Sequence, residues 1–230
     1  MRALVGMLVA LVVLLALAVG ADRVVDYNVE KRAAESLAGQ LGTTPDVDVA
    51  GFPFLTQWGS GRYERVTVTA DRATLGDTRV EDVEMVLSDL RAPAYVSNER
   101  DVAAATAGSL RMTGTLPYGS LALPAGIKAK RNGTSRRTVH LSGEVEVLGQ
   151  RPKFEAVVRV SLRDGQVRLE PRSVDFLGGI PSAAITALVR DNLTLTLSPD
   201  VPEGTAITGL AVADDGLDLT VTGTNVTMPR

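Results

Sequence analysis

The sequence contains no cysteine and only one histidine, His140. The absence of cysteine excludes disulfide bonds, thiolate nucleophiles and lipobox acylation. With a single histidine, neither a dedicated metal site nor a Ser-His-Asp arrangement is expected, and no nucleophile-elbow, Walker or Rossmann motif is present. We therefore expect a protein that is not an enzyme, with no catalytic residues, no metal and no cofactor.

The chain also lacks an excess of positive charge, because it has 24 Lys and Arg residues but 27 Asp and Glu residues, for a net charge of −3. A nucleic-acid-binding protein needs a basic field, so no nucleic-acid partner is expected. The carboxylate pairs Glu81-Asp82 and Asp214-Asp215 are not expected to act as catalytic pairs, since adjacent strand residues point to opposite faces.

The chain begins with a long uncharged stretch, residues 3–21. At about 1.5 Å per residue, a helix of this length just spans a bilayer. Two alternatives follow for residues 1–21: a signal anchor, which we favour, or a signal peptide cleaved after Val19-Gly20-Ala21. In both cases Arg2 places residues 22–230, a single domain, on the periplasmic or cell-wall side of the cytoplasmic membrane.

After this stretch the hydrophobic period predicts an α+β fold. An i, i+4 apolar stripe predicts a long amphipathic helix that ends at Gly42, and residues 181–190 predict a second, short helix. Period-two alternation predicts long antiparallel strands joined by tight turns. The spacing leaves open whether the sheet is flat or strongly curved around the long helix. The stripe consists of Val25, Val29, Ala33, Leu37 and Leu41; the strands are expected near 66–70, 83–87, 139–147, 154–162, 167–169, 193–197 and 217–221; the turns are Asn132-Gly133, Asp164-Gly165 and Asp215-Gly216.

Aromatic residues make up only 4% of the chain, yet they cluster in and after Gly51–Gln57. Pro53 disfavours a central strand, so this stretch is expected to be an extended edge segment or a bulge. Two interpretations remain: a core plug at the seam of helix and sheet, or the wall or mouth of an apolar binding cavity. The candidate residues are Phe52, Phe54, Leu55 and Trp58.

A local basic cluster stands out in this acidic chain. It is either the solvated end of a hairpin or a surface that contacts anionic headgroups of a membrane. In the second case the apolar residues Leu116, Leu121, Leu123 and Ile127 are expected to insert beside it. The cluster consists of Lys128, Lys130, Arg131, Arg136 and Arg137.

Three stretches, Thr44–Gln57, Gly61–Tyr63 and Leu197–Leu210, resemble the LmeA-like phospholipid-binding family of actinobacteria. This resemblance covers most of the chain, and it implies a tubular, BPI-like lipid-binding fold. It also implies a noncatalytic protein at the outer face of the cytoplasmic membrane that binds a phospholipid or a lipid-linked glycan. The implied role is support of lipoglycan (lipomannan-type) maintenance in the cell envelope, with an envelope glycosyltransferase considered as a protein partner. The alternative is an envelope scaffold that binds an enzyme without holding lipid.

Overall fold

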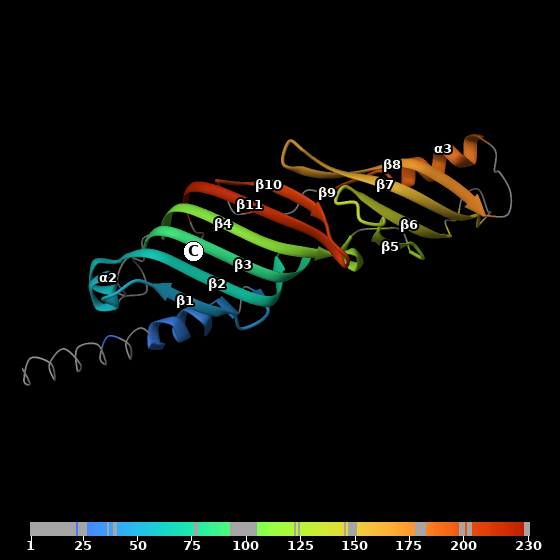
Figure 1. The fold of residues 1–230 in the computed structure, drawn as a ribbon. Helices are drawn as coiled ribbons and strands as arrows, with labels where there is room; N and C mark the ends of the chain where they lie inside the picture. Colours follow the sequence, from blue (N-terminus) through green and yellow to red (C-terminus); the bar gives the residue numbers. More distant parts are fainter. Residues whose placement is uncertain are drawn as a thin grey trace, which may run out of the picture.

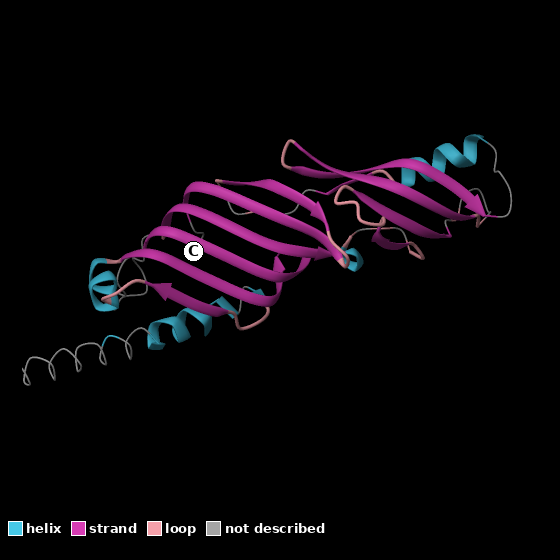
Figure 2. Ribbon diagram, in the orientation of Figure 1, coloured by secondary structure: helices cyan, strands magenta, loops and turns pink. Residues whose placement is uncertain are grey.

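The part of the chain that the structure describes is mostly strand, and each of its strand pairs is antiparallel. Figures 1 and 2 show an elongated molecule in which two sheets follow one another along the long axis, with few helices. The expected antiparallel, curved architecture is confirmed, but the expected single sheet is wrong, because the strands divide into two sheets. The computed structural model describes residues 22, 27–35, 37–38, 41–75, 78–92, 105–121, 123, 125–144, 146, 151–177, 183–197, 201 and 204–227.

The first sheet is curled and has six strands in the order β1-β2-β3-β4-β11-β10. In its long strands apolar and polar residues alternate, and the apolar ones point to the core. Val66 and Val68 of β2, for example, are only 7% and 4% exposed. The stretch between residues 92 and 123 contains β4. The strands are β1 (Asp46–Ala50), β2 (Arg62–Leu75), β3 (Thr78–Arg91), β4 (Thr106–Pro117), β10 (Thr205–Val212) and β11 (Gly216–Thr227).

The second sheet has five strands in the order β5-β6-β7-β8-β9. Its longest hairpin turns at Asp164-Gly165, where both residues have positive φ, 52° and 73°, as a two-residue turn requires. The predicted second helix is confirmed as α3 (Ala183–Asn192), which buries Val189 against this sheet, and Leu193, directly after the helix, is buried in the same core. The strands are β5 (Lys128–Arg131), β6 (Thr138–Glu144), β7 (Lys153–Arg163), β8 (Gln166–Leu177) and β9 (Leu195–Leu197).

The N-terminal helical segment, residues 27–35, packs against the first sheet. Val29, Ala33 and Leu37 of the predicted stripe contact the core around β1 and β2, and Glu30 accepts a hydrogen bond of 2.9 Å from the backbone N–H of Val49. Beyond residue 35, helix is described only at residues 37, 38 and 41, so the expected long helix is not supported. The expected membrane helix lies outside the described residues, and none of the helices within them is long and apolar enough to cross a bilayer.

The expectation of an extended segment at Gly51–Gln57 is wrong. Residues Phe54–Ser60 form a short helix, α2, at the end of the first sheet (Figure 1). Pro53 occupies the position before the helix, where its missing N–H costs nothing, and Gly61 ends the helix in the left-handed conformation, with φ 64°. The Pro and Gly that disfavour a strand therefore bracket a helix.

The two sheets share one continuous core. Leu217 and Ile207 of the first sheet lie in the same buried cluster as Val158 and Leu169 of the second. Polar contacts also cross the junction: the backbone N–H of Val212 donates to the carbonyl of Arg136 (2.9 Å), and the guanidinium of Arg131 pairs with Asp214 (2.8 Å).

Tyr118, in the short 3-10 helix η1 (Tyr118–Ser120), packs against the core at the junction. Its hydroxyl donates a hydrogen bond of 2.8 Å to the carbonyl of Ala213. Burial raises the pKa of Tyr118 from its ordinary value of 10.0 to about 12; Arg131 opposes this shift, and nearby aspartates add to it. The neutral phenol is thus favoured in the folded state, so its contribution to stability is complete below pH 10 and is lost as the pH rises through about 12.

We expect the Tyr118→Phe variant to lose less stability than the wild type between these two pH values. Urea unfolding of both proteins across that interval measures the difference. Identical pH dependence of the two free energies of unfolding would contradict the assignment.

Candidate functional site

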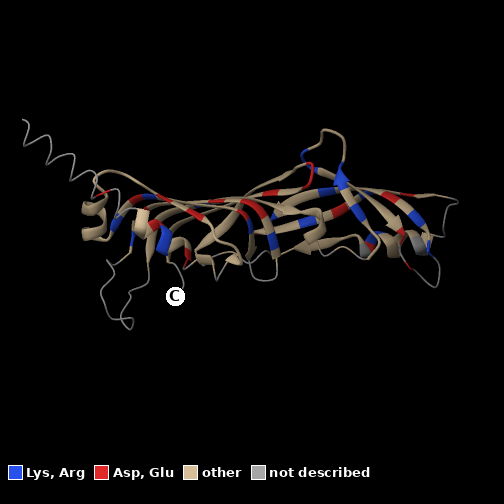
Figure 3. Ribbon diagram, turned by 90° about the horizontal axis from the view of Figure 1, so that it is seen from below, with Lys and Arg blue, Asp and Glu red and all other residues tan. Residues whose placement is uncertain are grey.

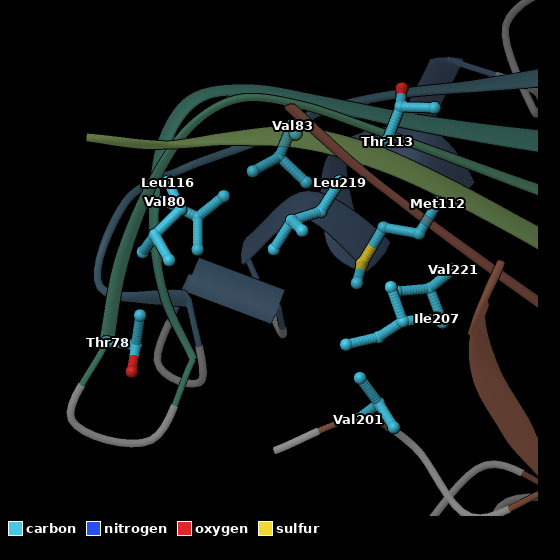
Figure 4. Close-up of a pocket in the computed structure, with 11 residues that line it drawn as sticks. Thr78, Val80, Val83, Met112, Thr113, Leu116, Val201, Ile207, Leu219 and Val221 are labelled. Carbon is cyan, nitrogen blue, oxygen red and sulfur yellow. The ribbon is translucent and has the colours of Figure 1, made fainter. Parts of the chain in front are cut away.

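An apolar cavity opens on the concave side of the first sheet, where side chains of β3, β4, β10 and β11 converge (Figure 4). Its only polar side chains, among the described residues, are the hydroxyls of Thr78 and Thr113. Such a lining favours apolar atoms and offers few partners to a polar ligand. The cavity is lined by Thr78, Val80, Val83, Met112, Thr113, Gly114, Leu116, Val201, Ile207, Leu219 and Val221.

Strand register explains why these residues meet. Met85, Met112, Val221 and Ile207 are direct cross-strand partners from β3 to β10, so they form one apolar row across four strands. Val80 and Val83 both reach the cavity although three positions separate them. A register irregularity between Glu81 and Glu84, with Asp82 at φ 51°, changes the alternation of side chains between them.

Gly114 of β4 limits how closely the lining can pack. A Cβ atom at this position would lie 2.8 Å from Cγ1 of Val80, so the backbone itself forms part of the cavity wall. The cavity has a volume of about 40 Å³, whereas pockets for small-molecule ligands typically have roughly 300–1,000 Å³. Its own side chains therefore nearly fill it, and a larger apolar guest requires the lining to separate.

Met112 is the residue best suited to such a rearrangement. It is half-buried and packs against each of the three apolar clusters, that of the sheet junction, that under the N-terminal helical segment and that around Ala73. An unbranched thioether changes shape at low cost. Met112 thus lies where movement in one cluster affects the others.

The four residues predicted as a cavity wall differ in their exposure to solvent. Phe54 is fully buried and packs against the Tyr63 ring, with 6.3 Å between the ring centroids. Phe52, Leu55 and Trp58 are exposed, at 59%, 40% and 38%. None of these four residues lines the apolar cavity, which lies toward the other end of the sheet; from Thr106, at the α2 end of β4, to Met112 the strand extends about 20 Å.

The basic cluster lies in β5 and the turn that follows it, on the second sheet near the junction. Lys128, Lys130, Arg136 and Arg137 are exposed, whereas Arg131 is paired with Asp214. Figure 1 shows β5 far from α2 along the molecule, so the two surfaces considered from the sequence for lipid contact are separate.

The apolar residues expected to insert beside the basic cluster are not available for insertion. Leu116 and Leu121 are 3% and 5% exposed, and Leu123 and Ile127 pack against the same core. The reason is that these positions close the junction between the two sheets.

Groups that carry out chemistry do not converge within the described part of the chain. Its Asp, Glu and His residues form no cluster that could hold a metal ion. The imidazole of His140 lies 3.6 Å from the carboxylate of Glu155 on the neighbouring strand, and the Glu81 carboxylate pairs with Arg79. Each is a contact between two residues, and neither belongs to a larger group of converging side chains within the described residues.

The sequence did not identify the cavity itself. Leu110, Met112, Gly114 and Leu116 do recur at every second position of β4, which is the signal that could have located this strand. The position of β4 in the sheet, however, depends on its pairing with β11. The paired residues are 99 to 121 positions apart along the chain, and no local pattern indicates this pairing.

Comparison with known proteins identifies a family. A family model described as "LmeA-like phospholipid-binding" matches residues 18–222 of the 230-residue chain. No curated protein and no solved structure gives a significant match.

Proposed function

Because the chain belongs to the LmeA-like phospholipid-binding family, we propose that it holds the acyl part of a phospholipid or lipid-linked glycan on the concave face of its first sheet. The observation that carries this proposal is the cavity, whose lining is apolar except for two threonines. Each methylene buried there contributes about 0.8 kcal/mol, so an acyl chain binds without specific polar contacts.

Binding in this proposal widens the cavity. The acyl chain separates β3 side chains such as Val83 from those of β11 such as Leu219, and Met112 lines the cavity beside them. The surrounding clusters re-pack around the guest, and the apolar surface of the lipid replaces contacts that the lining residues made with one another.

The proposed role is noncatalytic. Its support is the family description, which names binding, together with a cavity lining in which the described residues supply no acid, base or activated nucleophile. The lipid is held, and the protein makes or breaks no covalent bond in it.

We place the protein, also as a proposal, at the outer face of the cytoplasmic membrane, in support of lipoglycan maintenance. The uncharged residues 3–21 and the orientation given by Arg2 support the location. The envelope role and a glycosyltransferase partner rest on the family resemblance alone. A scaffold that holds no lipid is the competing function.

Lipid retention separates the two functions. The purified full-length chain is expected to release phospholipid on organic extraction, and native mass spectrometry is expected to show a lipid-bound species. If no lipid is retained and none is taken up from phospholipid vesicles, the result supports the scaffold function and contradicts the lipid-binding proposal.

A further inference from the structure

A small apolar patch lies at the α2 end of the molecule, away from the cavity. It consists of the exposed side chains of Phe52, Leu55 and Trp58. Residues 49–61 carry no charge, and Figure 3 shows α2 without acidic or basic residues at the end of a molecule whose strands carry both. Large apolar side chains that gather on an uncharged surface indicate a contact surface.

Hydrogen bonds join the start of α2 to Asp22, the residue that follows the uncharged stretch 3–21. Asp22 is 2% exposed, and its two carboxylate oxygens accept hydrogen bonds from the backbone N–H groups of Phe54 (2.9 Å) and Leu55 (2.7 Å). A carboxylate that caps the first turn of a helix holds that turn in place. Asp22, the residue that follows the uncharged residues 3–21 in the sequence, therefore lies at the start of α2.

The contacts and composition point to one partner, a phospholipid bilayer. Residues 3–21 are long enough to span its hydrocarbon core, and aromatic side chains such as Trp are enriched at the level of the headgroups. We propose that Phe52, Leu55 and Trp58 rest in the interfacial layer of the membrane that holds residues 3–21, and so fix how the elongated domain stands on that membrane. This inference rests on the membrane location given under the proposed function.

The charges beside the patch determine how this contact responds to salt. A groove of about 530 Å³ next to α2 is lined by Arg62 and Arg91, which are direct cross-strand partners, and also by Glu64 and Asp89. The two positive and two negative groups balance. The contact is therefore mainly apolar and persists at high salt, unlike contact through the basic cluster at β5.

Trp58 is the only tryptophan, so its fluorescence reports on the patch without labelling. The full-length chain is reconstituted into vesicles of phosphatidylcholine and phosphatidylglycerol that carry a nitroxide either near the headgroup or near the end of the acyl chain. Trp58 emission is expected to shift to shorter wavelength than in the lipid-free chain, and the shallow nitroxide is expected to quench it more than the deep one. Aqueous iodide should quench it weakly, at low and at high salt.

A matched pair of variants tests the role of the side chains. The Phe52→Ser/Leu55→Ser double variant should make Trp58 accessible to iodide in vesicles. Leu188→Ser should leave Trp58 unchanged, because Leu188 is also 40% exposed on a helix, α3, at the opposite end of the molecule (Figure 1).

The outcomes distinguish this inference from the proposed function. Strong iodide quenching without quenching by either nitroxide, in chains that float with the vesicles, overturns docking through α2 and leaves lipid retention in the cavity untouched. Failure of the chain to float overturns both the location and the docking. Loss of extractable lipid with Trp58 still at the interface contradicts only the proposed function.

Discussion

Replacing Phe54 with Ala is expected to lower the free energy of unfolding by about 3–5 kcal/mol. The side chain is fully buried, and it lies where the N-terminal helical segment, α2 and the β1–β2 edge of the first sheet meet. Removal of the ring leaves a cavity that this junction of three elements cannot close. Urea unfolding of the purified chain measures the loss.

The exposed neighbour Leu55 provides the matched control. Leu55→Ala alters the same helix, but its side chain is 40% exposed, so a change within about 0.5 kcal/mol is expected. Equal effects of the two substitutions would contradict the assignment of Phe54 to the core and of Leu55 to the surface.

A second large effect is expected for Met112→Glu, which introduces a charge into the lining of the cavity. An unpaired buried charge costs well over the 1.4 kcal/mol that corresponds to about a tenfold change in binding, so retained lipid per chain should fall at least about tenfold. Extraction and quantification of lipid from the purified full-length protein measure this ratio.

Arg111→Glu is the control for that experiment. Arg111 is exposed and precedes Met112 on β4, so its side chain points to the other face of the sheet, and its substitution should leave lipid retention unchanged. Lipid bound only through residues 3–21 would be retained equally by both variants, and this outcome would contradict binding in the cavity. If thermal unfolding shows that Met112→Glu does not fold, Leu219→Glu introduces the same charge from β11.

The sequence predicted secondary structure better than it predicted the site. Period-two alternation identified most strands, and the turn at Asp164-Gly165 was identified from two residues. The extended conformation expected for the aromatic stretch is wrong because Pro53, which disfavours a strand, also precedes a helix that Gly61 ends. Local residue types do not indicate that Phe54 points into the core while Phe52 points to solvent.

The division into two sheets and the position of the cavity depend on contacts between distant residues. The partners of Met112 are Met85 on one side and Val221 on the other, and the pairing of Arg131 with Asp214 likewise joins parts of the chain far apart. The resemblance of the sequence to a phospholipid-binding family did indicate the class of ligand, a lipid. It did not show which face of which sheet would hold that ligand.

The most direct test of binding on the concave face is photolabelling of the full-length chain with a phospholipid that carries a diazirine at the end of one acyl chain. Mass spectrometry of the cross-linked peptides identifies the residues that contact the acyl end. We expect label on cavity residues of β3, β4 and β11, among them Val83, Met112 and Leu219, and its loss in competition with unlabelled phospholipid. Label confined to residues 3–21 and α2, with none on these three strands, would contradict lipid binding on the concave face of the first sheet.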